Sequence, residues 1–235
     1  MQWNDAVQIP NIGYREVSVV IGDGLPERTP TSEFLNTIMA HAPNYGGWPP
    51  WVDLRGAGKH LHPYVHDKGW ELLVIGDRTT PSDRYLSFWR IEPTGRLYDL
   101  QGFDDDLYPG HVPGEQLDFY LQIADVGEII ATALALARGF NPPADSDIHF
   151  HFRWTGLHGR QLTSWTSPNR PLRPYSPAVD DAYDVSVSVP LDTPISAIAP
   201  YVQRVVVGLF ALFGGASFRD EVIDGIVAER LRRRR

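Results

Sequence analysis

The sequence predicts an α+β fold, with a largely antiparallel, strongly twisted sheet and helices packed on one side of it. The first observation behind this prediction is that several stretches alternate apolar and polar residues, as a strand with one buried face does. The second is the content of 20 Pro and 21 Gly, which indicates many turns and is too high for a helical bundle. The third is a set of apolar stripes with helical spacing near the carboxyl end, which predicts helices that cover the sheet.

The most regular strand lies at residues 148–155. Its apolar side chains are expected to enter the core and its polar side chains to face a groove or water. Gly156 and Gly159 bracket a short turn, after which we expect Gln161 to Trp165 to return as the second strand of a hairpin. The apolar residues are Ile148, Phe150, Phe152 and Trp154, and the polar residues are His149, His151, Arg153 and Thr155.

The amino-terminal half is expected to begin with a polar arm over residues 1–14. A strand follows, then a helix capped by Thr31 or Ser32, and then three strands that form an antiparallel meander. Residues 43–68 show little periodicity, apart from a short strand at 52–55. The acidic run Asp104–Asp106 predicts a solvated turn, because adjacent carboxylates diverge and a calcium loop spaces its ligands. The predicted strands are 15–22, 70–75, 84–91 and 96–103, and the predicted helix is 33–42.

The carboxyl-terminal half is expected to alternate strands and helices. Alternating apolar residues predict a strand over 117–123, and Asp125 is a plausible N-cap for a helix that ends at Arg138. The predicted elements after the central hairpin are a Pro- and Arg-rich connector at 167–177, a strand at 183–189 and two helices at 198–213 and 217–231. We find no internal repeat or linker, so residues 1–235 are expected to form one domain, with a C-terminal helix and basic tail over 217–235.

Composition limits the class of protein. The sequence has no Cys, so disulfides and thiolate metal sites are excluded. No signal segment is visible, and the longest apolar run is about half of the roughly 20 residues that a membrane span needs. These features predict a soluble, cytoplasmic protein. The net charge of −8 disfavours nucleic acid and anionic membranes as partners of the whole chain, although Arg230 and Arg232–Arg235 form a basic tail.

Histidines offer the clearest candidates for metal chemistry. His149 and His151 lie two residues apart on one strand face, so both imidazoles can reach one ion, with His60 and His62 as further ligands to Zn or another divalent metal. The alternative is that these histidines face solvent or are satisfied by neighbours. Motifs for a zinc protease, a serine hydrolase and a phosphate-binding loop are absent, so we expect no cofactor. Trp48 and Trp51 could form a stacking platform or cover a sheet edge.

Several motifs in order resemble a bacterial family. They are W-P-P-W-V-D-L, P-Y-V-H-D, F-W-R-I-E-P-T-G-R-L-Y-D-L-Q-G-F-D-D-D, F-R-W-T-G-L-H-G-R-Q-L-T-S-W and V-P-L-D-T-P-I. Over about residues 48–231 the chain resembles the C-terminal region of proteins whose N-terminal part is an AlbA-like, Schlafen-type DNA- or ATP-binding module. The resemblance implies an accessory domain that senses a ligand or docks a partner for such an effector module. It implies no catalytic residue.

The sequence therefore favours a non-catalytic sensor or interaction domain that binds a small anionic ligand or a protein. Guanidinium groups suit such a ligand because they fork onto a carboxylate or phosphate. One alternative is a metal-dependent hydrolase that uses the histidine cluster, and another is nucleic-acid binding through the Arg-rich connector and tail. The candidate surface consists of His149, His151, Arg153 and Arg160, together with the loop of Trp48 and Trp51.

Overall fold

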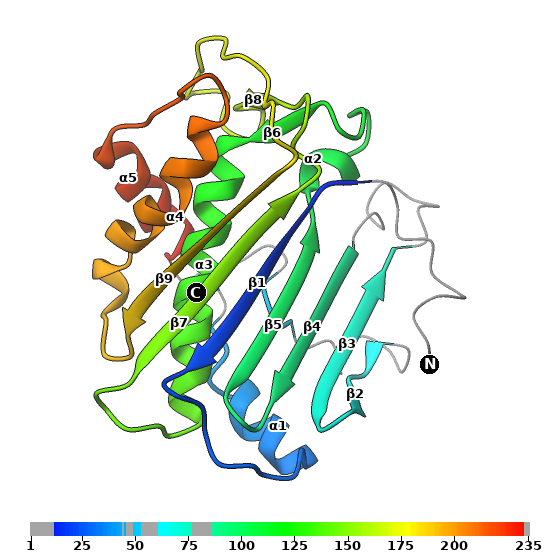
Figure 1. Cartoon of the computed structure of the whole chain (residues 1–235), viewed down its shortest axis with the longest axis vertical. Coiled ribbons are helices and arrows are strands. Elements are labelled where there is room, and N and C mark those ends of the chain that lie inside the picture. Colours follow the sequence, from blue (N-terminus) through cyan, green and yellow to red (C-terminus); the bar gives the residue numbers. More distant parts are fainter. Residues whose placement is uncertain (1–11, 44, 46–48, 53–60, 77–85, 233–235) are drawn as a thin grey trace.

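The computed structural model describes residues 12–43, 45, 49–52, 61–76 and 86–232. A seven-stranded antiparallel sheet forms one layer, and helices cover one of its faces (Figure 1), which confirms the α+β fold. The strand order is β2-β3-β4-β5-β1-β7-β9, and two further strands, β6 and β8, pair in parallel at one end of the molecule. The strands are β1 Tyr14–Ile21, β2 Tyr64–His66, β3 Gly69–Ile75, β4 Leu86–Glu92, β5 Arg96–Gly102, β6 Gln116–Asp118, β7 Asp147–Thr155, β8 Gln161–Thr163 and β9 Ala182–Pro190.

The helix layer is built around α3 (Phe119–Gly139), which packs against α1, α4 and α5. By length and composition α3 could cross a membrane, but 78% of its apolar window is buried inside the fold. Its hydrophobicity therefore reflects a central place in the core. The other helices are α1 Ser32–Met39, α2 Asp104–Leu107, α4 Ala199–Ala211 and α5 Asp220–Arg230, with a 3₁₀ turn at Ile195–Ala197.

The alternation predicted for the central strand β7 is confirmed. Phe150 is 2% exposed, and Phe152 and Trp154 are fully buried, while the intervening polar side chains are exposed on the opposite face. The rings of these three residues stack along the strand at centroid distances of 5.9 and 5.8 Å. The strand and helix predictions for β1, α1, the β3-β4-β5 meander, β9, α4 and α5 are also confirmed, with ends that differ by a few residues.

Two predicted elements around the central strand are wrong. β8 does not return along β7, because β7 pairs with β1 and β9, and β8 pairs in parallel with β6. The predicted strand at 117–123 is mostly the first turns of α3. That helix is capped by Asp118, whose carboxylate accepts from the backbone N–H groups of Tyr120 and Leu121, and not by Asp125. The short strand predicted at 52–55 lies mostly outside the described residues.

The acidic run is not a solvated turn. It forms α2, in which Asp105 is 1% exposed and Asp106 is 4% exposed. Both oxygens of Asp106 accept hydrogen bonds from the guanidinium of Arg160, at 2.8 and 2.5 Å, and this pair is almost fully buried. The same carboxylate accepts from the backbone N–H of Gly13 and of Gly114, both at 2.7 Å. One buried ion pair thus joins α2, the entry to β1 and the turn after β7.

A second ionic network fastens the sheet to the helices. Arg15 on β1 donates to Asp125 on α3 at 2.8 Å and to Gln101 on β5 at 3.0 Å. Arg230 on α5 donates to Glu128 on α3 at 2.6 Å and lies 3.5 Å from Asp125. Because these cations bridge different elements, they fix how α3 and α5 lie against the sheet.

We predict that Arg160→Met destabilises the protein by about 3–5 kcal/mol, since it leaves the Asp106 carboxylate buried without its cation. Urea denaturation measures the change in the free energy of unfolding. Arg170→Met is the matched control. Its guanidinium pairs with Glu229 at 3.0 Å on the surface, so a loss of less than about 1 kcal/mol is expected. Equal losses in the two variants would contradict the structural role of the Arg160–Asp106 pair.

Candidate functional site on the open face of the sheet

The face of the sheet opposite the helices carries an ordered pair of imidazoles on β7. His149 Nδ1 lies 2.8 Å from Ser188 Oγ, and His151 Nδ1 lies 3.1 Å from Ser186 Oγ on the neighbouring strand β9. The pairing follows from register, because His149 faces Ser188 and His151 faces Ser186 across the antiparallel ladder. Since Nδ1 of each ring is engaged by a serine, Nε2 is the nitrogen left for a ligand.

Two exposed guanidinium groups share this face. Arg153 follows His151 by two residues on β7, and Arg96 begins β5 in the same cross-strand row as Val20 and His149. Both arginine side chains are exposed, and neither makes an ion pair or hydrogen bond with another described residue. At strand spacing, Arg96 lies about 10 Å from His149, and Arg153 lies about 13 Å from His149 along the strand. We name His149, His151, Arg153 and Arg96 the cationic strip.

Acidic residues border the strip. Glu16 and Asp184 flank Arg153 in register on β1 and β9. Burial, followed by the charge of Glu16 and a hydrogen bond to it, raises the pKa of Tyr98 on β5 far above its ordinary value. Tyr98 therefore stays protonated and donates to Glu16, which draws that carboxylate toward β5.

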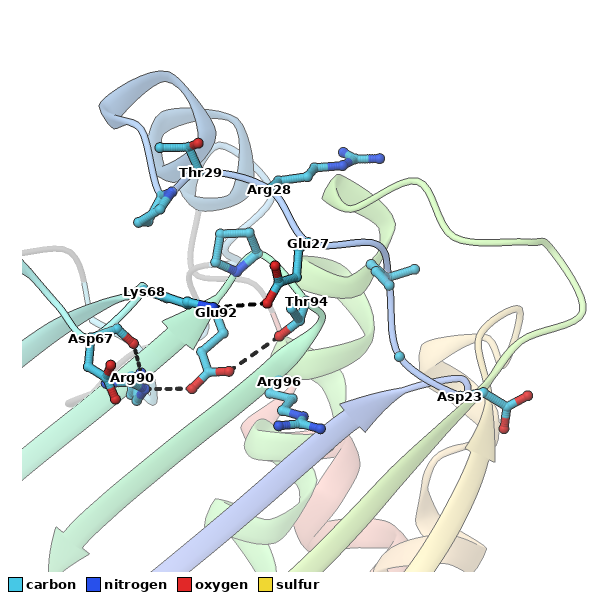
Figure 2. Close-up of a pocket in the computed structure, with 14 residues that line it drawn as sticks. Asp23, Glu27, Arg28, Thr29, Asp67, Lys68, Arg90, Glu92, Thr94 and Arg96 are labelled. Atoms are coloured by element: carbon cyan, nitrogen blue, oxygen red, sulfur yellow. Dashed lines mark hydrogen bonds and ion pairs between the residues drawn. The ribbon is translucent and has the colours of Figure 1, made fainter.

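A polar groove of about 1040 Å³ adjoins the strip at Arg96. It lies between the β4–β5 turn, the β2–β3 turn and the chain that leads from β1 to α1 (Figure 2). Half of its eight charged side chains are already paired. Lys68 contacts Glu27 at 3.0 Å, and Arg90 is held by Glu92 at 2.7 Å, by Glu71 and by two backbone carbonyls. Figure 2 shows Arg96 extending over the sheet, whereas Arg28 and Asp23 point away from the centre of the groove.

Two of the predicted ligand-binding residues do not belong to this surface. Arg160 is 1% exposed and is bound to Asp106, so it is a structural cation and not a partner of His149. Trp51 is also 1% exposed, and its indole N–H donates to the carbonyl of Tyr98 at 3.0 Å, so it cannot act as an exposed stacking platform. Trp48 lies outside the described residues.

The described histidines do not converge on a metal position. His62 precedes β2 at one edge of the sheet, and five strand spacings, about 24 Å, separate β2 from β7. Within the described part of the chain, no group of three or more His, Cys, Asp or Glu side chains is placed to hold a metal ion. His60 lies outside that part.

The arginines of the connector and tail are largely engaged. Arg170 contacts Glu229 at 3.0 Å and Arg230 contacts Glu128 at 2.6 Å, while Arg173 lies over the ring of Tyr175 at 5.0 Å. The last three residues, Arg233–Arg235, lie outside the described residues.

Buried carboxylates with shifted pKa values form a separate group beneath the sheet. Burial raises the pKa of Asp99, Asp105 and Glu128 to about 7 in each case, against the lowering effect of nearby cations or hydrogen-bond donors. Raised carboxyl pKa values are a feature of catalytic acids. None of the three lines the small cavity bounded by Arg15 and Gln101, which has only about 20 Å³ and can hold no more than a water molecule. These carboxylates therefore bear on stability and not on a ligand.

A scan of protein-family models, a search of curated proteins and a search of solved structures each found no match to this chain.

The sequence alone does not reveal that one member of the cationic strip, Arg96, and the two serines that contact its imidazoles lie together. The sequence does show that Arg96, Ser186 and Ser188 occupy polar positions in strands that alternate polar and apolar residues. What the sequence does not show is that β9 and β1 flank β7 and that β5 lies next to β1. The strand order brings these residues to the imidazoles.

We predict that stability falls as pH rises from about 4 to 7, in part through Asp99. Its pKa is about 7 in the folded protein, against an ordinary value of 3.8, so the folded state holds the proton more tightly in this window. The contribution of Asp99 is fully present below about pH 4 and is lost as the pH approaches 7, at up to about 1.4 kcal/mol per pH unit. Urea denaturation at pH 5 and pH 7 should give a smaller decrease for Asp99→Asn than for the parent, by about 1–2 kcal/mol. Identical decreases in the free energy of unfolding in the parent and in Asp99→Asn would contradict the raised pKa of Asp99.

Proposed function

We propose that this chain is a non-catalytic binding domain that recognises a small molecule with two or more carboxylate or phosphate groups on the cationic strip. The observation that carries the proposal is that two guanidinium groups, neither of them paired with another described residue, flank two oriented imidazoles on a sheet face that no described helix covers. The domain would sense a cytoplasmic ligand of this kind and transmit its binding to a partner protein. Our candidate for that partner is a Schlafen- or AlbA-like effector module.

The chemistry of the four side chains supports an anionic ligand. A guanidinium donates through a planar fork that matches a carboxylate or phosphate. An imidazole whose Nδ1 is held by serine presents Nε2 in a fixed direction, so little side-chain freedom is lost on binding. Positions about 10 and 13 Å apart suit a molecule whose anionic groups are separated, and not a single isolated ion.

Binding is favoured over catalysis because of where the reactive groups lie. The carboxylates with raised pKa values are buried on the helix side of the sheet, and the imidazoles are exposed on the other side. The partners of the imidazoles are serine hydroxyls on an open sheet, where water is not excluded. These contacts orient the rings. The metal-dependent hydrolase has no such support.

We predict that sodium triphosphate and citrate, which test phosphate and carboxylate groups separately, bind to the parent protein in calorimetric titrations. Arg96→Ala and Arg153→Ala should each weaken binding of the preferred anion at least tenfold, about 1.4 kcal/mol, since each removes a charged donor. Arg219→Ala is the matched control, because Arg219 is exposed in the helix layer before α5 and is remote from the strip.

The proposal would be overturned by equal affinities in all three variants or by binding of neither anion. A single-stranded oligonucleotide that binds the strip variants normally, and is released when Arg232–Arg235 are deleted, would favour the nucleic-acid alternative instead.

A further inference from the structure

The sheet ends in two edges of very different length. β2, at one edge, has three residues, whereas β9, at the other edge, runs for nine residues from Ala182 to Pro190. Proteins usually protect a long edge with lysine, with a bulge or with an internal proline, because its free backbone groups can pair with another strand. β9 has none of these before its last residue, Pro190, and pairs continuously with β7.

The free backbone groups of β9 can be assigned from the hydrogen-bond register. Leu191 N–H donates to Ser146 O at 3.0 Å, and Gly22 N–H donates to Asp147 O at 2.8 Å. Because hydrogen-bonded pairs alternate along an antiparallel ladder, odd-numbered residues of β9 direct their N–H and C=O groups toward β7. The even-numbered residues Ala182, Asp184, Ser186 and Ser188 direct theirs outward. No described residue pairs with this outward row through its backbone.

The helix layer extends past this edge. Figure 1 shows α4 and α5 lying beyond β9, on the side where a further strand would be added. Gly208 on α4 lies directly against the hydroxyl of Tyr183 on β9, so the adjacent surface of α4 borders the vacant position. That surface includes Arg204 and Ala211, which are exposed and lie four residues before and three residues after Gly208 on the helix. Tyr183 and Val185 are only half-buried, whereas Val187 and Val189 are buried.

The negative charge around the β9 edge favours a partner strand that carries basic residues. Four exposed carboxylates mark the edge, with two just before β9, one within it and one just after it; they are Asp180, Asp181, Asp184 and Asp192. An added strand would therefore gain from basic residues at its ends, and from apolar residues at the alternate positions that face Ala211 and Val185.

We propose that β9 is a docking edge for an extended segment of another protein, with alternating apolar side chains and basic ends, which adds an eighth strand over α4. Backbone hydrogen bonds to the even-numbered residues supply binding, and the apolar positions and end charges supply selectivity. This edge lies beside the cationic strip, but the proposal does not depend on an anion binding there.

Backbone amide exchange tests the assignment of the edge. In the full chain, the amides of Asp184, Ser186 and Ser188 should exchange rapidly, and those of Val185, Val187 and Val189 slowly. The probe is the peptide Lys-Val-Thr-Val-Thr-Val-Thr-Val-Lys. Its addition should slow exchange at the even-numbered positions at least tenfold and leave the odd-numbered positions unchanged.

Three variants test the recognition chemistry by fluorescence titration of the labelled peptide. Ser186→Pro removes one outward N–H without removing a bond to β7, and should weaken binding at least tenfold. Asp184→Lys should weaken binding at least fivefold and improve binding of the same peptide with glutamate ends. Ala211→Glu should weaken both peptides, and it keeps the test valid if proline at position 186 prevents folding. Arg219→Ala, remote from the edge, is the control.

The proposal is overturned if millimolar peptide leaves the even-numbered amides unprotected, or if Asp184→Lys and Ala211→Glu bind like the parent. It is also overturned if the even-numbered amides are already protected in a dimeric sample without peptide, because a second copy of the chain then occupies the edge.

Discussion

The buried pair of Arg160 and Asp106 is the constraint on which one end of the molecule depends. Desolvating two charges is costly, and the cost is offset only when the geometry is good and the remaining hydrogen-bonding groups are satisfied. Here the guanidinium also donates to the carbonyls of Gly156 and Gln116, and the carboxylate also accepts from Gly13 and Gly114. The motifs D-D-D and T-G-L-H-G-R therefore supply the two partners of a buried ion pair that holds this end of the fold together. Their unusual residue content has an explanation in folding and requires no chemistry.

The sequence could predict those parts of the fold that local patterns determine, and it missed those that depend on distant partners such as Arg160 and Asp106. Period-two alternation identified β7 and β9 because each has one buried and one exposed face. The same pattern misled at residues 117–123, since α3 is buried on nearly all sides and its apolar residues need not follow one stripe. The acidic run was misread because the partner of Asp106 is 54 positions away, and no local pattern reveals such a pair.

The candidate site was predictable to the same extent. His149, His151 and Arg153 were placed on one polar face because alternation along a single strand is a local property. Arg160 was assigned to that face through an expected hairpin that does not form. Trp51 was a candidate either for a stacking platform or for a cover of a sheet edge, and its burial in the core excludes the platform. Arg96 was missed because it reaches the strip through strand order, with β1 between β5 and β7. Strand order is set by long-range packing and cannot be read from periodicity.

The two proposed surfaces meet on β9. Ser186 and Ser188 orient the imidazoles through their hydroxyls, and the backbone groups of the same two residues belong to the outward row at the edge. A strand added at that edge would place its own side chains about 5 Å from these serines, on the open face of the sheet. It would therefore form a new wall along one side of the cationic strip. Partner binding and ligand binding, if both occur, would be coupled through β9, since each ligand would then alter contacts available to the other.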